Sequence, residues 1–497
     1  MDETETARAH GELSARQLAA GAYGPALESM ISALRLAPDL AALWAQFSDL
    51  VRYFNFRHPA EPVRALLERA LEHPAVDPGN LVRPISSIAL SHPQGPLAEP
   101  LLLRLLEDVV IRDATLEHAL TDARRRMLDA PLPLPVMRAI AHQCFNTEYV
   151  FDETPEERSK VEALSGKLGS LESYAAYAAY RPLPDANLAQ TPLASLARRQ
   201  IAEPQEERRL ASTIESIGEE PTGVSAAVRA QYEANPYPRW VRIPAALGLP
   251  DIAGLPQNPR ILVAGCGTGQ HALTTAQRFP GGSVLAVDLS LSSLAYAKRK
   301  TLELGVRNIE YRRADILALG ALEERFDLVE CSGVLHHMED PFEGWRVLAG
   351  LRKAGGPMRI GLYSEAGRRA VVRARGLIAS RGLRPDAQGI RAARAEVRKD
   401  PALEQLARNE DFFSMSGCRD LLFHVQEQRF TLPQIDSMIS RLGLRFLGFE
   451  FADSGAALQR YRSLFTQDNL CVDLGNWDRL ERQFPDTFSR MYQFWVS

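Results

Sequence analysis

The chain has 497 residues, which is too long for one hydrophobic core and predicts two or three domains. Charged residues make up 24% and apolar residues 45%, the balance of an ordinary globular protein. The net charge of −4 excludes a surface built as a whole to attract a polyanion. Five cysteines without a C-x-x-C pair argue against a zinc ribbon or a disulfide framework and predict a reducing, cytoplasmic location; no metal site is predicted. No apolar stretch approaches the ~18 residues of a membrane span.

Residues 1–200 are predicted to be a helical domain with a weak internal repeat. Ala33 and Ala70 stand 37 positions apart, and Pro38 and Pro74 follow them. This pattern resembles the tetratricopeptide repeat, in which a small residue lets paired helices approach and a proline ends the second helix. A plain helical domain is the alternative. Helix-pair arrays offer a concave face to a peptide or protein, so the resemblance implies such a partner, a second subunit or a merely supporting role.

Residues 201–240 are predicted to be a linker helix and a strap. The helix at 224–232 is amphipathic and leads into Asn235-Pro236-Tyr237-Pro238. The two prolines predict a rigid, extended strap.

Residues 260–288 hold the most informative motif. The apolar run 260–264 leads into Gly265, Gly267 and Gly269, and a helix is predicted over 271–279. A second apolar run, 283–287, ends in Asp288. Glycines let the backbone pass close to a ligand, and an acid about 20 residues on can accept hydrogen bonds from two ribose hydroxyls. Dinucleotide-binding folds have the motif G-x-G-x-x-G. Gln270 occupies the position of the third glycine of that motif, so the sequence disfavours NAD as the cofactor.

The elements that follow keep the same order of strand and helix. A strand at 308–312 leads to Asp315, and a strand at 326–332 opens onto the segment VLHHMEDP. A helix at 341–352 then precedes a strand at 358–363. Together with the G-x-G-x-G turn and the segment LRKAGG, these pieces resemble class I S-adenosylmethionine (SAM) methyltransferases over about residues 230–365 and 430–455.

The resemblance implies an α/β fold: a Rossmann-like class I methyltransferase sheet, with the N-terminal all-α tetratricopeptide-like domain and a helical insertion after the fifth strand. The methyltransferase domain would comprise residues 241–365 and 430–497. The insertion would comprise residues 366–429 and act as a basic lid.

The resemblance also implies roles for particular residues. The glycine turn would lie under the methionine part of SAM, Asp288 would hold the ribose and Asp315 the adenine. Cys331 and Ser332, at the end of the fourth strand, would face the methyl group. The implied cofactor site comprises Gly265, Cys266, Gly267, Thr268, Gly269, Asp288, Leu289, Asp315, Ile316, Cys331 and Ser332. His336 or His337 could act as a general base, although a histidine pair here often packs or caps a helix.

The insertion is strongly basic. Residues 366–399 contain ten Lys and Arg against Asp386 and Glu396, a net charge of +8. One interpretation is a lid that attracts an acidic acceptor or RNA. The other is a solvated helix face held by acidic patches of the helical domain. After the insertion we expect a helix at 435–442, a sixth strand at 444–451 and a helical, aromatic-rich tail at 477–495.

The sequence therefore predicts a SAM-dependent methyltransferase. The acceptor could be a protein or peptide held by the helical domain, an acidic small molecule or, third, RNA. The alternative from another class is a non-enzymatic scaffold whose Rossmann-like domain only binds SAM, which Val263 slightly favours because the family often has an acid at that position. The methylated atom and the oligomeric state do not follow from the sequence.

Overall fold

The computed structural model describes residues 3–246, 252, 254–451, 454–488 and 491–497. The chain divides into two compact units. The first comprises Met1–Gln205, Arg239–Gly248 and Arg408–Gly417, and the second comprises Glu206–Pro238, Leu249–Ala407 and Cys418–Ser497. The domain predicted at residues 1–200 thus lies within the first unit, which also takes in two short segments from later in the chain.

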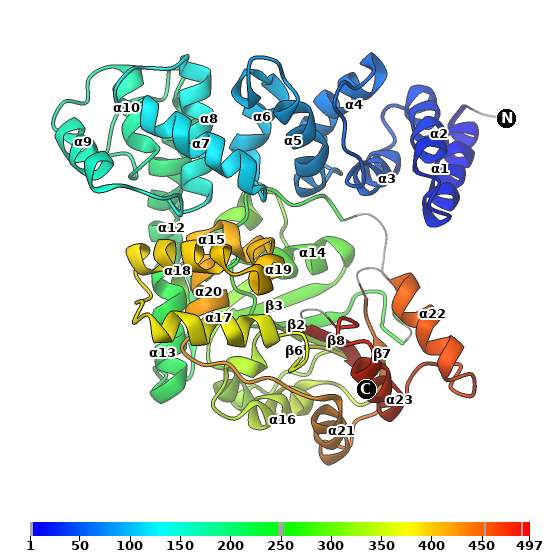
Figure 1. The fold of residues 1–497 in the computed structure, drawn as a ribbon. Helices are drawn as coiled ribbons and strands as arrows, with labels where there is room; N and C mark the ends of the chain where they lie inside the picture. The colour runs from blue at the N-terminus through cyan, green and yellow to red at the C-terminus, as the bar shows by residue number, and fades with distance from the viewer. Residues whose placement is uncertain (1–2, 247–251, 253, 452–453, 489–490) are drawn as a thin grey trace. The chain divides into compact units, whose positions relative to one another are not determined.

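The first unit is built from helices, drawn in blue to cyan in Figure 1. The helices that lie before residue 200 are α1 (Glu3–Ala19), α2 (Tyr23–Leu36), α3 (Ala41–Val51), α4 (Glu61–Glu72), α5 (Val82–Leu90), α6 (Pro100–Asp108), α7 (Ala114–Arg126), α8 (Leu134–Asn146), α9 (Pro155–Ser165), α10 (Leu171–Ala178) and α11 (Ala194–Ala197). The predicted helical character of this region is confirmed.

Small residues let these helices pack closely. A Cβ added to Gly11 of α1 would lie 2.7 Å from Leu43 Cδ2 of α3. Ala33 in α2 and Ala70 in α4 are both fully buried. As predicted, α2 and α4 end shortly before Pro38 and Pro74. The assignment to tetratricopeptide repeats stays a prediction.

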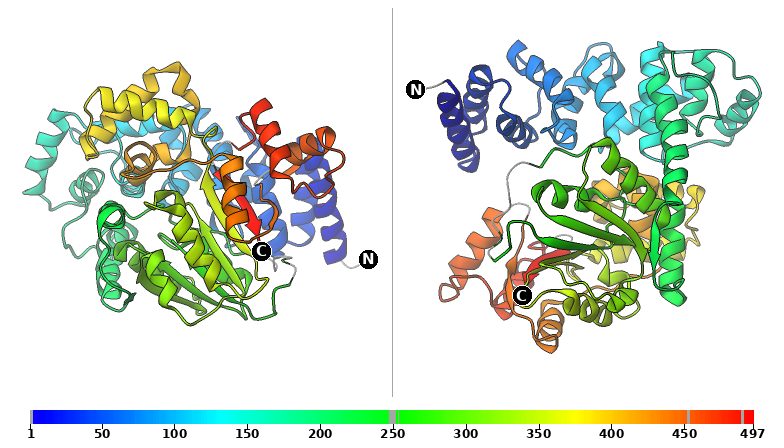
Figure 2. Two further views of the ribbon diagram at one scale, coloured as in Figure 1. Left: turned by 90° about the horizontal axis from the view of Figure 1, so that it is seen from below. Right: turned by 180° about the vertical axis from the view of Figure 1, so that it is seen from behind.

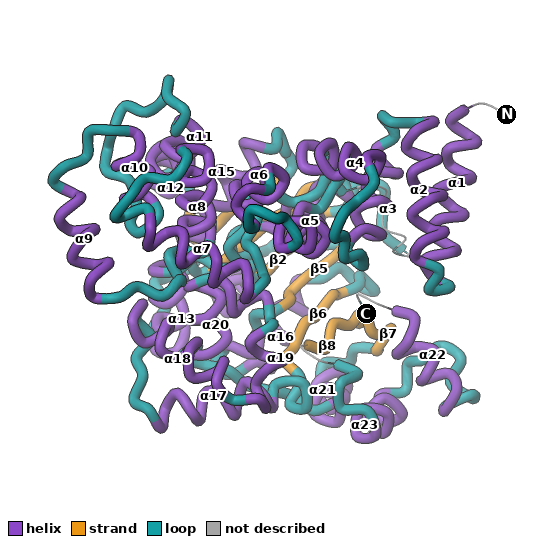
Figure 3. Tube along the Cα trace, turned by 45° about the horizontal axis from the view of Figure 1, so that its top comes forward, coloured by secondary structure: helices purple, strands orange, loops and turns teal. Residues whose placement is uncertain are grey.

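The second unit contains one eight-stranded sheet, which Figure 3 shows in orange. Its strands are β1 (Glu215–Ile217), β2 (Arg260–Ala264), β3 (Ser283–Asp288), β4 (Ile309–Ala314), β5 (Leu328–Ser332), β6 (Met358–Tyr363), β7 (Phe446–Phe449) and β8 (Met491–Val496). The order is β1-β4-β3-β2-β5-β6-β8-β7. Strands β1 to β6 pair in parallel, whereas β8 is antiparallel to both β6 and β7. The order reverses between β2 and β5, which is where doubly wound sheets bind ligands.

Alternate residues of the strands serve two separate cores, one on each face of the sheet. Ile261 and Val263 pack with α14 (Gln270–Arg278) and α15 (Leu291–Glu303). Leu262 and Ala264 face the other core, which contains residues of α16 (Pro341–Leu351), α21 (Leu432–Arg441) and α23 (Leu474–Gln483). Figure 2 shows the sheet from two further directions. Helices on both faces confirm a mixed α/β fold of the Rossmann-like kind.

The predicted helical tail is wrong over its last part. Helix α23 ends at Gln483, and residues 491–496 form β8, which lies between β6 and β7. Tyr492, Phe494 and Val496 are fully buried while the residues between them are half-buried, the alternation of a strand with one buried face. The aromatic composition of the tail is compatible with a helix or a strand. The alternation of buried and half-buried residues identifies a strand. Residues 489–490 lie outside the described part of the chain.

Several other segments belong wholly or mostly to the second unit. The predicted linker forms α12 (Glu203–Ala211), the edge strand β1, which the sequence did not predict, and α13 (Gly223–Ala234). The insertion forms α17 (Arg369–Ser380), α18 (Ala387–Lys399), the short α19 (Glu404–Ala407) and α20 (Met415–Phe423), and α22 (Ser454–Leu464) follows β7. None of the described helices combines the length and the apolar character that crossing a membrane requires.

Candidate active site

A cavity of about 820 Å³ opens at the carboxyl ends of the parallel strands in the second unit. Its walls come from the turn after β2, the tip of β3, the turns after β4 and β5, helices α13 and α14 (Gln270–Arg278), and residues of β6 and β8. The volume lies within the roughly 300–1,000 Å³ of small-molecule sites. The cavity therefore coincides with the reversal of strand order, where the sequence predicted a ligand.

The glycine turn begins directly at the end of β2. Gly265, Gly267 and Gly269 all have positive φ, at 75°, 53° and 84°. A Cβ on Gly265 would lie 2.2 Å from Val334 Cγ2, and one on Gly267 would lie 2.6 Å from the backbone oxygen of Tyr237. Both residues line the cavity. Side chains other than hydrogen would therefore meet the protein itself at these two positions.

Gly269 and Thr268, in the same turn, contact other parts of the protein rather than the cavity. A Cβ on Gly269 would lie 2.5 Å from the Cβ of Ala297 in α15, so this glycine lets α14 and α15 approach. Thr268 Oγ1 donates to the carbonyl of Pro238 at 2.6 Å. The described lining of the cavity includes neither residue, whereas Cys266 is part of it. The motif thus has one half that lines the cavity and one half that packs against the protein.

Asp288 joins the glycine turn to the tip of β3. Its Oδ2 accepts from the N–H of Gly267 at 2.8 Å, and its Oδ1 accepts from the N–H of Ser290 at 2.9 Å. Each carboxylate oxygen has a second lone pair, so both can still accept a hydroxyl proton. Burial raises the pKa of Asp288, and the two backbone N–H groups act in the opposite direction. Asp288 lines the cavity together with Leu289.

Asp315 and Ile316 form another part of the wall, after β4. Asp315 Oδ1 accepts from the N–H of Leu317 at 2.9 Å and caps a short 3₁₀ helix. This bond fixes the carboxylate beside Ile316 in the cavity lining. Both residues were predicted from the sequence to belong to the site.

The predicted strap lies against the glycine turn. Tyr237 and Pro238 line the cavity, and the N–H of Thr268 donates to the carbonyl of Tyr237 at 3.3 Å. Just before the strap, Glu233 accepts from the N–H groups of Leu291 and Ser292 at 2.8 and 2.9 Å. A carboxylate at the first turn of a helix is stabilised by the free N–H groups there. Helix α13 and the strap are therefore held by both α15 and the glycine turn.

Cys331 does not lie where the sequence prediction put it. Its side chain is fully buried in the core that contains α16, and the described cavity lining lacks it. Burial raises the pKa of this thiol to about 12, so it stays protonated. The next residue, Ser332, does line the cavity. Neighbouring residues of a strand point to opposite faces, so only one of the two can face the ligand.

The two neighbouring histidines also differ, because His336 lies in the protein interior and His337 lines the cavity. His336 is fully buried, stacks on Tyr363 with 3.7 Å between ring centroids, and has no hydrogen-bond partner for either ring nitrogen among the described residues. Burial lowers its pKa well below the ordinary value. His337 lines the cavity, and its Nδ1 lies 2.7 Å from the carbonyl oxygen of Gln426. Of the two candidates for a base, only His337 has access to the cavity.

Three further residues lie around His337. Tyr232 of α13 and Asp420 of α20 line the cavity and are joined by a 2.5 Å hydrogen bond. His424 follows α20 and stacks on His337 with 3.6 Å between ring centroids. Tyr232 and Asp420 lie 188 positions apart, so no local spacing could have paired them.

A second buried carboxylate lines the cavity on β5. Glu330 accepts from Thr275 Oγ1 at 2.7 Å and lies 3.2 Å from His271 Nε2. Burial pushes the pKa of Glu330 upward, but His271, Thr275 and Arg359 outweigh it and lower the pKa to about 2. Glu330 is thus a charged group of the cavity wall, although it lies on a strand predicted only from its apolar run.

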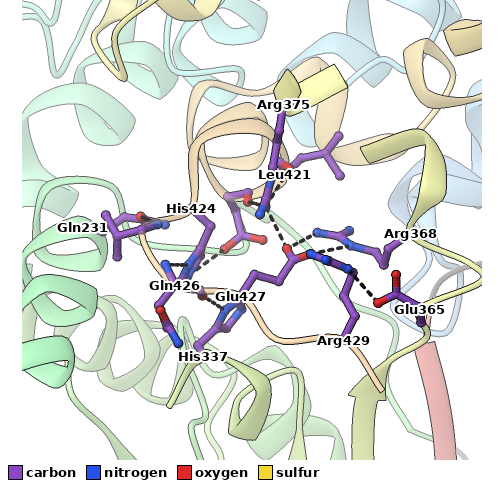
Figure 4. Close-up of polar contacts among 12 residues, drawn as sticks. Gln231, His337, Glu365, Arg368, Arg375, Leu421, His424, Gln426, Glu427 and Arg429 are labelled. Atoms are coloured by element: carbon purple, nitrogen blue, oxygen red, sulfur yellow. Dashed lines mark hydrogen bonds and ion pairs between the residues drawn. The ribbon is translucent and has the colours of Figure 1, made fainter. Parts of the chain in front are cut away.

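The cations of the basic insertion are absent from the described cavity lining, although Asp420 of the insertion is part of it. Instead, several of its cations are paired within the second unit. Arg368 and Arg375 bind the buried Glu427, and Figure 4 shows both contacts. Arg373 binds Asp400, and Arg381 and Lys399 bind Glu396. The acidic groups of the described lining are Asp288, Asp315, Glu330, Asp420 and Glu450, and its arginines are Arg278 and Arg359. The cavity therefore has an acidic lining despite the basic segment.

Comparison with known proteins gives the family. Residues 261–356 match a family described as a methyltransferase domain. Over 287 residues the chain is 31% identical to an uncharacterized protein of Synechococcus sp., and the match covers 52% of this chain and 68% of that protein. The chain belongs to the family of this Synechococcus protein. It contains a class I SAM-dependent methyltransferase domain, and SAM is the cofactor of that domain.

More distant relatives have named activities. The chain is 36% identical over 107 residues to a ubiquinone biosynthesis O-methyltransferase of Bordetella avium, which covers 21% of this chain and 43% of that enzyme. A ubiquinone biosynthesis O-methyltransferase of Pseudomonas fluorescens (strain Pf0-1) is 34% identical over 146 residues, 27% of this chain and 62% of that enzyme. The chain thus spans less than two thirds of the length of these O-methyltransferases.

Among solved structures, PKMT2 from Rickettsia typhi in complex with AdoHcy is similar, with 17% identity, a TM-score of 0.38 and 49% of each chain covered.

The residues of the cavity fit SAM. The cofactor carries two positive charges, on sulfur and nitrogen, against one carboxylate. Five carboxylates against two guanidinium groups in the cavity wall match this net positive charge. The fixed carboxylate of Asp288 offers the acceptors that a ribose diol needs.

We expect substitutions at Cys331 and Ser332 to act differently, although the two residues are neighbours. Cys331→Ala should leave the SAM affinity within about twofold of the original, because its side chain lies in the core, and should cost roughly 1 kcal/mol of stability. Ser332→Val adds bulk to the cavity wall and should weaken SAM binding about tenfold or more. Calorimetric titration of both variants checks this, and a large affinity loss in Cys331→Ala alone would show that the faces are reversed.

Proposed function

We propose that the second unit transfers the methyl group of SAM to a small, uncharged acceptor. The sulfonium of SAM supplies an already activated methyl group. The tasks left to this chain are to bind the cofactor, align the acceptor with the methyl group and exclude water.

The roles proposed for the residues follow from their places around the cavity. Asp288 would hold the ribose, Asp315 the adenine, and the backbone at Gly265 and Gly267 the methionine part. Ser332, at the end of β5, would lie near the methyl group. The observation that carries the proposal is the position of Asp288: its carboxylate is fixed by two backbone N–H groups and lines the same cavity as the glycine turn.

The charge of the cavity supports an uncharged acceptor. An anionic acceptor would face five carboxylates and two guanidinium groups, and one of those guanidinium groups, that of Arg359, is already bound to Glu450. The arginines of the insertion, which suggested an acidic acceptor or RNA, are absent from the described lining. The names of the O-methyltransferase relatives add support for an oxygen atom as the methylated group.

Titration calorimetry with SAM, with its demethylated product and with NAD tests the cofactor part. We expect one SAM or product molecule per chain and no heat with NAD. A folded sample that gives no heat with SAM would defeat the proposal.

Methyl-labelled SAM and a cell extract test the acceptor part. We expect the label in the small-molecule fraction after the protein is added. Label in the protein fraction would point to a polypeptide acceptor instead, and binding without any transfer would favour the non-enzymatic scaffold.

A further inference from the structure

The backbone of one residue, Gln426, sets the protonation of two stacked histidines beside the cavity. The Nδ1 of His337 lies 2.7 Å from the carbonyl oxygen of Gln426, and a carbonyl can only accept, so Nδ1 carries the proton. The N–H of the same Gln426 donates to Nδ1 of His424 at 3.0 Å, so there Nδ1 holds the lone pair. Figure 4 shows His337, Gln426 and His424 together. The neutral rings are therefore opposite tautomers, with the lone pair of His337 on Nε2 and the proton of His424 on Nε2.

The proton on His424 Nε2 begins a short hydrogen-bond chain. Tyr232 Oη lies 3.1 Å from this nitrogen and accepts from it. The hydroxyl of Tyr232 in turn donates to Asp420 Oδ1 at 2.5 Å. Burial lowers the pKa of His424 to about 2 and raises that of Tyr232 well above its ordinary value, so the first is neutral and the second is protonated. Every donor in the chain has an acceptor, and Asp420 is held in one orientation.

The same residues could at first be taken for a metal site. One ligand atom from each of His337, Asp420 and His424 lies within 4.8 Å of the others. A metal would need the lone pair of His424 on Nε2, but a neutral imidazole has a single lone pair and Nδ1 uses it for Gln426. Tyr232 also already fills the space between His424 and Asp420. The hydrogen bonds therefore favour proton transfer over metal binding.

We propose that His337 and Asp420 form a subsite for a neutral acceptor hydroxyl, held in place by Tyr232 and His424. His337 Nε2 accepts the hydroxyl proton, and the nearby carboxylate of Asp420 stabilises the imidazolium that results. The inference rests on the proposed function. It adds the class of acceptor, a molecule methylated at a hydroxyl oxygen, and assigns Tyr232 and His424 as positioning residues.

The proton and electron count of the step is complete without a further reactant. The acceptor O–H bond breaks and its proton goes to His337 Nε2. An oxygen electron pair forms the new bond to the methyl carbon, while the pair of the carbon–sulfur bond returns to sulfur. The imidazolium later gives its proton to water.

The alternative protic acceptor, an amine, fits less well. An ammonium nitrogen has no lone pair until its proton has left, so deprotonation must come first. Burial lowers the pKa of His337 below its ordinary value, so its imidazole is a far weaker base than an alkylamine, whose ammonium form has a pKa of about 10.4. A hydroxyl oxygen keeps its lone pairs while protonated, so proton loss and attack can share one step.

Nitrogen NMR of the full chain, labelled with ¹⁵N-histidine and bound to the demethylated product of SAM, tests the assignment directly. We expect His337 protonated on Nδ1 and His424 protonated on Nε2. Tyr232→Phe removes the hydroxyl that accepts from His424 and should shift the His424 Nε2 resonance alone, whereas Tyr237→Phe, a matched change in the same cavity wall, should not. Identical tautomers in the two rings would overturn the inference.

Small probes test the acceptor class in the same sample. Phenol should shift the His337 Nε2 resonance, and benzoate and benzylamine should not. A response to benzylamine but not phenol would make the acceptor an amine, and no response to any probe would exclude an open hydroxyl subsite. One equivalent of Zn²⁺ retained by the original chain but not by Asp420→Asn would show a metal site instead. Calorimetry with the product of SAM separates these failures from failure of the proposed function, since cofactor binding is measured independently of the histidines.

Discussion

Replacing Asp288 by alanine is expected to weaken SAM binding at least 100-fold, about 2.8 kcal/mol. The carboxylate is placed to accept from two ribose hydroxyls, and hydrogen bonds to charged groups contribute roughly 1.5–3 kcal/mol each. The change also removes the acceptor for the N–H groups of Gly267 and Ser290, which fix the glycine turn. Titration calorimetry with SAM measures the loss.

Asp340→Asn is the matched control for this change. Asp340 is exposed, caps α16 through the N–H groups of Phe342 and Glu343, and is not part of the described cavity lining. Asparagine caps helices about as well as aspartate, so affinity and stability should both be retained. An Asp288→Ala variant that binds SAM as tightly as the control would refute the ribose assignment.

Replacing Glu427 by alanine is expected to cost about 3–5 kcal/mol of stability. The side chain of Glu427 is 1% exposed and binds both Arg368, which is 7% exposed, and Arg375. Without it the guanidinium groups of Arg368 and Arg375 would lose this counter-charge (Figure 4). Burial raises the pKa of Glu427, but the two arginines outweigh it, so the pKa is lowered and the stabilisation disappears as the pH falls from the ordinary value of 4.5 through the lowered one. Chemical denaturation at neutral pH measures the loss.

Glu396→Ala serves as the comparison on the same insertion. Glu396 binds Arg381 and Lys399, whose side chains are both largely exposed. Exposed ion pairs contribute little, so the denaturation curve should hardly move. Equal effects of the two substitutions would mean that the Glu427 pairs are screened by water and do not hold the insertion together.

The sequence by itself determined the parallel strands β2 to β6 and half of the site. Short apolar runs that end in glycine or aspartate predicted β2 and β3, because a buried parallel strand must be apolar and a turn with positive φ must be glycine. Asp288 and Asp315 followed from the same logic, since each comes directly after a strand. Local spacing carries this information, so one sequence was sufficient.

Only the tertiary structure decided which neighbours face the ligand and which distant residues join them. The position of Cys331 and Ser332 depends on which face of β5 lies toward the cavity, and a one-residue shift would exchange them. The aromatic tail became β8 because β6 and β7 leave a gap that an antiparallel strand fills. Tyr232, Asp420 and His424 meet His337 through contacts that only the folded chain brings about. Contacts between positions nearly 200 residues apart depend on the fold, and no local pattern encodes them.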